Sequence, residues 1–377
     1  MIRLMKSSDI DKIIKIEEET LNETLGFDML NEILTNKLMK AYVFLDNNNI
    51  LGYISISFDG ITLEILNFCV DKLNQHKGIG KKLLNYAIIN SYKEGCKNVI
   101  LDVRKDNINA IKLYESFGFK LIHIRKDYYK DLCDALIYEL KLNDYNEVID
   151  KELFLSTKSL ETDDYIKYYD DYQYDKYYHN FYKLKNLDKL DIIIEENKNK
   201  PFLCFEYDKD FNLKEFDEKD INIVMISFIN ALNIKTNYNG VIYIVDKNNI
   251  DDVSKFLYND SLRYGEEYSK KNTKRILDLI LNNNAYGFII KDDNQIVGFI
   301  IAYIEKDICD LEDFFILDNY QRKGYGSNLF KYALDFCKNK GCNLVSLVAD
   351  FEDTPKNMYE KWGLIEIEKT YFLRKGK

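Results

Sequence analysis

The sequence is poor in the residues that build disulfide frameworks, metal sites and membrane spans. Its seven cysteines are an odd number, widely scattered, with no Cys-x-x-Cys pair, which argues for reduced thiols over disulfides or a zinc ribbon. Its three histidines stand alone, so no metal site is expected. No apolar run approaches the roughly 18 residues of a membrane helix, and residues 1–9 lack the apolar core of a signal peptide. We therefore expect a cytoplasmic protein without a membrane partner.

Arginine is also scarce, because only seven of the 53 basic residues are Arg, and the formal net charge is −10. We therefore expect no nucleic-acid partner, because a protein with a negative net charge repels the phosphate backbone. The 377 residues are 46% hydrophobic and 31% charged, enough for a sizeable interior in two or three domains. Nothing in the composition indicates the oligomeric state.

The chain carries an internal repeat. Gln75 and Gln321, which are 246 residues apart, each begin the loop motif Gln-x-x-Gly-x-Gly. Each loop follows a short apolar strand and precedes a helix with aliphatic residues at i, i+3 and i+4. A further strand and a second short helix follow in both copies, and Tyr114 and Tyr359 lie 39 and 38 residues after the two glutamines. This agreement predicts a duplicated domain.

Upstream of each loop, the periodicity predicts helices and strands in a similar order. The first copy is expected to contain helix 9–19, a helix near 28–39, and strands 41–45, 50–58 and 61–70. The second is expected to contain strand 241–245, helices 250–259 and 269–283, and strands 286–291, 296–304 and 308–317. Mixed α+β domains follow at 1–143 and 240–377, so the predicted fold class is α/β with a mixed sheet. Residues 144–239 have weaker signals and form a predicted middle region.

A strand that enters a helix through Gln-x-x-Gly-x-Gly exposes backbone N–H groups at the helix N-terminus, where the helix dipole favours an anion. The glycines allow close backbone approach, and basic neighbours add positive charge, so a diphosphate is a suitable guest. A dinucleotide loop is disfavoured, because no acidic residue follows in a clear βαβ unit. Neither copy has the Gly-Lys-Ser/Thr of a Walker loop. A purely structural glycine turn is the alternative.

The order of strand, glycine loop, helix, strand and Asn-x-x-Ala-x-x-Leu-Tyr-x-x-x-Gly-Phe, which runs from Asn107 to Phe119, resembles the GNAT superfamily of acetyl-CoA-dependent N-acetyltransferases. The resemblance covers 1–143 and 240–377. It implies two acyl-CoA N-acyltransferase domains in tandem, with acetyl-CoA as the cofactor, no metal, and an amine acceptor. It also implies that the strand before the loop pairs with the pantetheine arm. The middle region is then a candidate for a degenerate third copy.

The first copy most resembles the ribosomal-protein-alanine N-acetyltransferases, which acetylate protein N-terminal α-amines. Residues 101–104, 110–119 and 124–129 carry this resemblance. It implies a general base at Asp102, where the family has Glu, and a general acid at Tyr114. A bridging water is expected to make up for the shorter side chain. The implied acetyl-CoA contacts are Phe68, Cys69, Val70, Gln75, His76, Lys77, Gly78, Ile79, Gly80, Lys81 and Asn107.

The second copy resembles the diamine and thialysine N-acetyltransferases through residues 311–315 and the loop that follows. That resemblance implies a general base at Glu312 and a general acid at Tyr359. The acidic group has changed strands between the copies, which suggests two acceptors: a protein N-terminal α-amine for the first and a small amine for the second. The implied cofactor contacts are Phe314, Phe315, Ile316, Gln321, Arg322, Lys323, Gly324, Tyr325, Gly326 and Ser327.

Each assigned role has an alternative. The two carboxylates are also consistent with solvated or ion-paired groups, and the two tyrosines with helix packing. Glu64 and Asp310 hold equivalent strand positions and are further candidates for the base. For the whole chain, one alternative is a coenzyme A-binding regulatory or scaffold protein with one or both sites inactive. A second is a detoxifying acetyltransferase of the aminoglycoside type.

Overall fold

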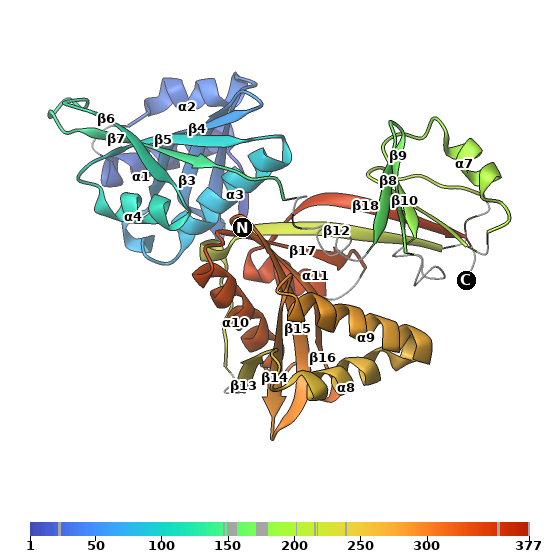
Figure 1. The fold of residues 1–377 in the computed structure, drawn as a ribbon. Coiled ribbons are helices and arrows are strands. Elements are labelled where there is room, and N and C mark those ends of the chain that lie inside the picture. Colours follow the sequence, from blue (N-terminus) through green and yellow to red (C-terminus); the bar gives the residue numbers. More distant parts are fainter. Residues whose placement is uncertain are drawn as a thin grey trace. The chain divides into compact units, whose positions relative to one another are not determined.

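The chain forms two compact units in the computed structural model (Figure 1). The first holds Met1–Asp144 and Ser227–Leu232, and the second holds Tyr145–Ile226 and Asn233–Lys377. The predicted middle region is thus shared between the two units. No helix in the part of the chain that is described is long and apolar enough to cross a membrane. The structure describes all residues except 22–23, 146–147, 149–156, 171–179, 201, 215, 217, 238–239, 353–354 and 376–377.

The first unit is a seven-stranded mixed sheet with helices on both faces. In sheet order its strands are β1 (Ile2–Leu4), β2 (Met39–Asp46), β3 (Asn49–Phe58), β4 (Thr62–Val70), β5 (Asn98–Arg104), β7 (Ala135–Lys141) and β6 (Lys120–Arg125). The helices are α1 (Ile10–Thr20), α2 (Gly26–Thr35), α3 (Ile79–Lys93) and α4 (Ile108–Ser116). All neighbouring strands are antiparallel except β4 and β5, which are parallel. The predicted fold class is confirmed.

The alternation of side chains along β2 explains how helices cover the sheet. Ala41 and Val43 belong to the hydrophobic core that β2 forms with α1 and α2. Tyr42, between them, packs edge-on against Tyr86 of α3 with ring centroids 5.2 Å apart. Because successive strand residues point to opposite faces, α3 lies on the face opposite to α1 and α2.

The strands β4 and β5 are paired over only part of β4. Their parallel register ends at the pair Ile65 and Leu101. At the same point the register between β3 and β4 shifts by one residue, because Leu66 forms a β-bulge. Beyond the bulge, β4 continues to Val70 beside β3 alone. The β4 amides on the β5 side therefore have no neighbouring strand to bond.

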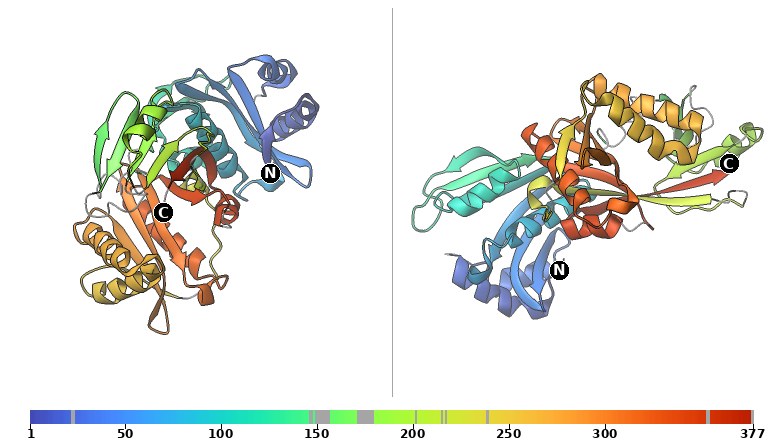
Figure 2. Two further views of the ribbon diagram at one scale, coloured as in Figure 1. Left: turned by 90° about the vertical axis from the view of Figure 1, so that its right-hand side faces the viewer. Right: turned by 90° about the horizontal axis from the view of Figure 1, so that it is seen from below.

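The second unit repeats this plan inside an 11-stranded sheet (Figure 2). In sheet order the strands are β13 (Val241–Ile244), β14 (Tyr286–Asp292), β15 (Gln295–Glu305), β16 (Ile308–Ile316), β17 (Leu344–Asp350), β12 (Glu218–Phe228), β18 (Ile365–Lys375), β11 (Leu203–Tyr207), β10 (Phe181–Leu184), β9 (Tyr165–Tyr169) and β8 (Lys158–Glu161). The helices are α7 (Leu190–Glu196), α8 (Ile250–Ser261), α9 (Glu266–Leu281), α10 (Tyr325–Asn339) and α11 (Pro355–Trp362). The central parallel pair is β16 with β17.

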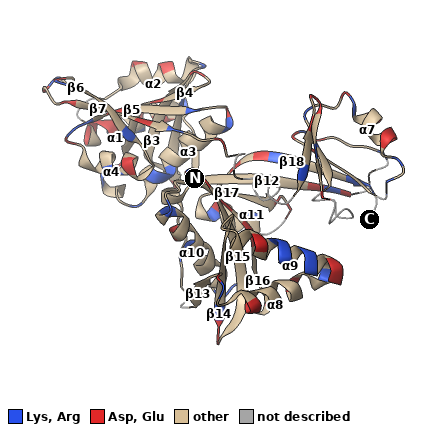
Figure 3. Cartoon of the chain, in the orientation of Figure 1, with Lys and Arg blue, Asp and Glu red and all other residues tan. Residues whose placement is uncertain are grey.

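The helix α9 is amphipathic. Ile276, Leu277 and Ile280 are buried, whereas Glu266 and Lys270 are exposed and form an ion pair of 2.6 Å one turn apart. Figure 3 shows charges of both signs along the outer side of this helix. Spacing of three and four residues therefore places the apolar side chains on the core side.

Strand β12 occupies a place that the order of the sequence does not suggest. In the first unit the last strand, β7, lies between β5 and β6, and in the second unit β12 lies at the equivalent place between β17 and β18. The amide of Phe351 donates to the carbonyl of Ile221 at 2.8 Å. The other edge of β18 pairs with β11. The second copy thus takes a strand that precedes it in the chain.

The predicted helix near 28–39 needs a correction. The helix α2 ends at Thr35, and Met39 already begins β2. Asn36 leaves the helical conformation, and its side chain accepts a hydrogen bond from the amide of Leu38 at 3.0 Å. Such a local side-chain bond favours a turn over continued helix.

Residues 227–232 are held in the first unit by a buried amide side chain. Asn85 of α3 is 3% exposed and accepts a hydrogen bond from the amide of Phe228 at 2.9 Å. The Ser227 hydroxyl lies 3.3 Å from the same oxygen. The ring of Phe228 packs against Phe117, with centroids 4.8 Å apart. One side chain thus satisfies a buried backbone donor that would otherwise be unpaired.

We predict that Asn85→Ala lowers the free energy of unfolding by about 1–3 kcal/mol, because the amide of Phe228 loses its acceptor inside the core. Urea denaturation of the full chain measures this. Lys93→Ala, at the exposed end of the same helix, is the control and should change the value by less than about 0.5 kcal/mol. Equal stability of the two variants would contradict the assigned role of Asn85.

Candidate active site

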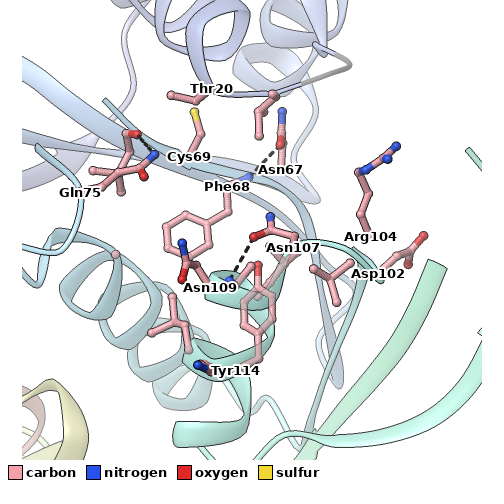
Figure 4. A pocket seen from close by; sticks show the side chains of 18 of the residues that line it. Thr20, Asn67, Phe68, Cys69, Gln75, Asp102, Arg104, Asn107, Asn109 and Tyr114 are labelled. Carbon is pink, nitrogen blue, oxygen red and sulfur yellow. Dashed lines mark hydrogen bonds between the residues drawn. The ribbon is translucent and has the colours of Figure 1, made fainter. Parts of the chain in front are cut away.

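A cleft of about 1530 Å³ opens where β4 and β5 separate (Figure 4). Its lining comes from the end of α1, from β4 and the glycine loop, from β5, from α4 and from the loop between β6 and β7. Pockets for one small ligand usually measure about 300–1,000 Å³, so this cleft has room for two substrates at once.

The glycine loop turns β4 into α3. The side chain of Gln75 donates from Nε2 to the carbonyl of Val70 at 3.1 Å, which fixes the start of the loop. His76 and Gly78 have φ of +61° and +81°, and α3 begins at Ile79. Glycine adopts this left-handed conformation at little cost. The loop thus brings the positive end of the α3 dipole to the cleft wall.

The start of α3 lies close against β4. A Cβ on Gly80 would lie 3.3 Å from Cζ of Phe68, tighter than an ordinary contact. Lys77 lies outside the lining, and its Nζ donates to Oδ1 of Asn74 at 2.8 Å. The other predicted contacts all line the cleft: Phe68, Cys69, Val70, Gln75, His76, Gly78, Ile79, Gly80, Lys81 and Asn107.

Helix α4 contributes two residues to the cleft, its N-cap residue Asn107 and the tyrosine Tyr114. Oδ1 of Asn107 accepts a hydrogen bond from the amide of Ala110 at 3.2 Å and so caps the helix. Tyr114 is 5% exposed, and its ring lies 6.5 Å from that of Phe68. Figure 4 shows its hydroxyl pointing into the cleft. Burial raises the pKa of Tyr114 above its usual value, so the phenol keeps its proton at neutral pH.

The carboxylate of Asp102 lies on β5. It is partly buried, and Nη1 of Arg125 lies 3.5 Å from its Oδ2. In Figure 4 the carboxylate points away from the Tyr114 hydroxyl, so the two predicted catalytic groups lie on separate sides of the cleft. Glu64, the other candidate base, also lines the cleft.

The loop between β6 and β7 forms a further wall. Arg104 on β5 donates to both carboxylate oxygens of Asp131, at 3.0 and 2.7 Å, and to those of Asp106, at 3.1 and 2.9 Å. Its guanidinium stacks 4.8 Å from the ring centroid of Tyr129. Tyr128 and Tyr129 both line the cleft. The contacts of Arg104 with Asp131 and Tyr129 could not be predicted from local sequence, because both partners lie more than 20 residues further along the chain.

A buried carboxylate supports β4 from the side of α1. Glu17 is fully buried and accepts hydrogen bonds from the Tyr53 hydroxyl and from Nδ2 of Asn67, the latter at 2.6 Å. Oδ1 of Asn67 accepts from the amide of Phe68 at 2.9 Å. This network orients Asn67, which lines the cleft. In the sequence, the only signal for Glu17 is its place four residues after the buried Ile13, which puts it on the same helix face.

The second unit contains a loop of the same geometry. Nε2 of Gln321 donates to the carbonyl of Ile316 at 3.0 Å. Arg322 and Gly324 have φ of +58° and +92°, and the helix α10 follows directly. Each feature matches its counterpart in the first unit, so the duplication extends to the hydrogen bonds and backbone angles of the loop.

The surroundings of this loop also correspond. A Cβ on Gly326 would lie 3.2 Å from Cζ of Phe314, as at the equivalent glycine of the first unit. Phe315 stacks against Phe256 of α8, with ring centroids 5.5 Å apart and ring planes 7° apart. The remaining predicted contacts lie in the loop or in the first turn of α10: Lys323, Tyr325 and Ser327.

The two predicted catalytic residues of the second unit lie on α11, the counterpart of α4, and on β16, the counterpart of β4. Tyr359 of α11 is 7% exposed, and its ring lies 5.8 Å from those of Phe330 and Trp362. Glu312 on β16 is partly buried. Loss of hydration, with the neighbouring Asp310, raises its pKa well above the usual value. A carboxyl with a raised pKa is a stronger base once it is ionised.

Comparisons with known proteins agree with this arrangement. The acetyltransferase (GNAT) family matches residues 9–119 and 254–364. An N-alpha-acetyltransferase of Saccharolobus solfataricus is 31% identical over 150 residues, which are 36% of this chain and 89% of that protein. A ribosomal protein bS18-alanine N-acetyltransferase of Haemophilus ducreyi is 33% identical over 130 residues, which are 34% of this chain and 88% of that protein.

A solved structure shares the fold over a longer stretch. A functionally unknown conserved protein from Staphylococcus epidermidis superposes with a TM-score of 0.52 at 20% identity, covering 62% of this chain and all of that protein. The N-terminal part of the chain resembles the ribosomal-protein-alanine N-acetyltransferases, whereas the resemblance of the second copy to diamine acetyltransferases stays a prediction. With the family pattern present twice, the chain belongs to the GNAT acetyltransferase family and contains two such domains in tandem.

Proposed function

We propose that the first unit transfers an acetyl group from acetyl-CoA to the α-amine at the N-terminus of a protein or peptide. The observation that carries this proposal is a single cleft lined by the glycine loop, by Asp102 and Tyr114, and by the loop between β6 and β7. The names of the relatives from Saccharolobus solfataricus and Haemophilus ducreyi support an α-amine as the acceptor.

The residues of the loop fit the diphosphate of coenzyme A. Gly78, with its positive φ, and Gly80, which packs closely against Phe68, have no side chains to cover the backbone at the start of α3. Lys81, exposed in the first turn of that helix, adds a positive charge. When bound, acetyl-CoA supplies an acyl thioester that a neutral amine can attack.

The protein's own groups then handle two protons. Asp102 accepts the proton of the incoming amine through a water molecule, which makes up for a side chain one methylene shorter than Glu. Tyr114, kept protonated by burial, holds the proton that the departing sulfur requires. An α-amine has a pKa of about 8, so a useful fraction is neutral near pH 7 and a weak base suffices.

The second unit is proposed to hold a second acetyl-CoA, with a small amine as its acceptor. Its loop supports this proposal, because the hydrogen bond from Gln321, the two positive φ angles and the close approach at Gly326 all correspond to the first unit. Glu312 and Tyr359 are its proposed base and acid. The geometry of the loop supports binding of acetyl-CoA, which a coenzyme A-binding scaffold would share, and only Glu312 and Tyr359 distinguish the catalytic role.

We predict that Asp102→Asn lowers kcat for acetylation of an alanine-terminated peptide by about 10²–10⁴-fold, the usual contribution of a general base, and leaves the Kd for acetyl-CoA unchanged. Thiol release measures the rate, and calorimetry measures the Kd. Glu64→Gln is the matched control, since it removes one negative charge from the same cleft. A loss confined to Glu64→Gln would move the base to that residue.

We predict that Arg104→Gln loosens the loop between β6 and β7 and raises the KM for the peptide severalfold. Hydrogen exchange of residues 126–134 should become faster. The hydrogen bonds from Arg104 lower the pKa of Asp131 below its ordinary value of 3.8. The contact between the two residues should therefore be fully formed at pH values above 3.8, and it should be lost as the pH falls through the lowered pKa. Lys120→Gln, on the exposed edge strand, is the control. Unchanged exchange in Arg104→Gln would show that the loop is held by other contacts.

We predict that the full chain binds two molecules of acetyl-CoA and that Gly80→Val and Gly326→Val each remove one, because the added side chain would meet Phe68 or Phe314. Isothermal titration gives the stoichiometry, and circular dichroism checks that each variant is folded. A stoichiometry of one in the unmodified protein would contradict the second site. Binding at both sites without faster thiol release for any amine would favour the scaffold alternative.

A further inference from the structure

The amide of Phe68 lies on the open side of β4, which faces away from β3. In an antiparallel pair of strands, residues that exchange backbone hydrogen bonds alternate with residues that do not. The amide of Asp71 donates to the carbonyl of Leu51 at 2.8 Å, so this pair of residues exchanges hydrogen bonds. Counting back along the register places Phe68 opposite Ile54 in a pair that does not. The N–H of Phe68 therefore points to the gap between β4 and β5.

A neighbouring side chain occupies this amide. Oδ1 of Asn67 accepts a hydrogen bond from the N–H of Phe68 at 2.9 Å, and both residues line the cleft (Figure 4). The ring of Phe68 lies 6.5 Å from that of Tyr114, the proposed acid. The amide of Val70, which points to the same gap, lies at the glycine-loop end of β4. The Phe68 amide thus belongs to the part of β4 beside the proposed acid, where the oxygen of an acyl group requires a hydrogen-bond donor.

A buried carboxyl group holds Asn67 in this position. Nδ2 of Asn67 donates to Oε1 of Glu17 at 2.6 Å, and the Tyr53 hydroxyl donates to the same oxygen. Glu17 is fully buried, and its Oε2 has no hydrogen-bond partner among the residues that the structure describes. A buried oxygen without a partner lowers stability. The stability of the fold therefore does not account for Glu17, and a role in the function of the cleft does.

The bond between Asn67 and the amide of Phe68 is not a requirement of the duplicated fold. In the matching registers, Asn67 and Tyr53 of the first unit correspond to Asp313 and Phe299 of the second. Phe299 has no hydroxyl that could complete the same anchor. The arrangement is therefore a property of the first unit, whereas the two glycine loops agree in their hydrogen bonds and backbone angles.

Acetyl-CoA and coenzyme A differ in what they offer to the amide of Phe68. The thioester of acetyl-CoA has a carbonyl oxygen, which is a good acceptor, whereas the thiol of coenzyme A has only sulfur, which is a weak one. An acyl oxygen that bonds to this N–H has to displace Oδ1 of Asn67. When no acyl group is present, Asn67 prevents a partly buried donor from remaining unpaired.

We propose that Asn67, anchored by Glu17, is a specificity residue that sets the affinity of the first unit for acetyl-CoA relative to coenzyme A. In the free protein its side-chain oxygen holds the place of the acyl oxygen. Acetyl-CoA binds by displacing it, and the bond forms again once the acetyl group has left with the amine. Coenzyme A leaves the bond in place. This inference rests on the proposed acetyl-CoA site and assigns Asn67 a role in discriminating substrate from product.

Calorimetric titrations of the full chain with acetyl-CoA and, separately, with coenzyme A test this role. Every protein, the reference included, carries Gly326→Val, which confines binding to the first unit. Asn67→Ala should raise the affinity for acetyl-CoA relative to coenzyme A by about 2–10-fold, the usual contribution of one hydrogen bond. Glu17→Gln keeps the shape of the side chain and weakens the anchor, so it should change the ratio in the same direction by a smaller factor.

Asn109→Ala is the matched control, because it removes another asparagine from the wall of the cleft. Any contact of Asn109 with coenzyme A is common to both ligands, so the ratio of the two affinities should stay at the reference value. A variant with a loosened fold should likewise lose affinity for both ligands alike. The ratio therefore separates the proposed competition from a merely structural role of Asn67.

An unchanged ratio in Asn67→Ala would overturn the proposal. Weaker binding of acetyl-CoA relative to coenzyme A would do so as well, because Asn67 would then support the acyl group instead of competing with it. Circular dichroism checks that each variant is folded, and Glu17→Gln decides the question if Asn67→Ala is not. If neither ligand binds the reference protein, the proposed acetyl-CoA site fails and this inference with it. If both ligands bind and the ratio does not change, this inference alone fails.

Discussion

The separation of β4 from β5 is the constraint on which the first unit depends. A sheet normally pairs every amide of an inner strand, and leaving such groups unpaired is costly unless a ligand or water takes the place of the missing strand. The bulge at Leu66 ends the pairing in the middle of β4. The β4 backbone that is freed lies beside the glycine loop at one end and beside β5 with Asp102 at the other. One local irregularity of the backbone therefore opens the cleft that is lined by the residues proposed to bind acetyl-CoA and the amine.

The second unit shows that this arrangement tolerates a change in how the chain supplies its strands. The place of β7 is taken by β12, which precedes the duplicated domain in the sequence. A sheet requires a strand of suitable direction and pattern at that position, and it does not matter from which part of the chain the strand comes. Because β18 pairs with β11 on its other edge, the strands of the middle region extend the same sheet.

Sequence patterns predicted the features that depend on local physics. The glycine loops could be found because left-handed backbone at Gly78 and Gly324 restricts which residues are tolerated, and the helices because their apolar spacing is regular. The place of β12 could not be predicted, since strand pairing between distant segments leaves no local periodicity. For the same reason neither the contact of Arg104 with Asp131 nor the role of Glu17 could be predicted, because each depends on side chains from distant segments. Helix α2 ended earlier than predicted because Asn36 forms a turn.

The two copies keep their backbone geometry while their polar side chains differ, and this contrast has a physical reason. Binding of a diphosphate uses backbone N–H groups and a helix dipole, so it constrains backbone angles and the glycines that permit them. Handling of protons uses side chains, which can move to another strand as long as they face the same opening. The two proposed bases illustrate such a change, because Asp102 lies on β5 whereas Glu312 lies on β16, the strand equivalent to β4. Divergence of the acceptor is therefore possible without any change in the part of the fold that is suited to the cofactor.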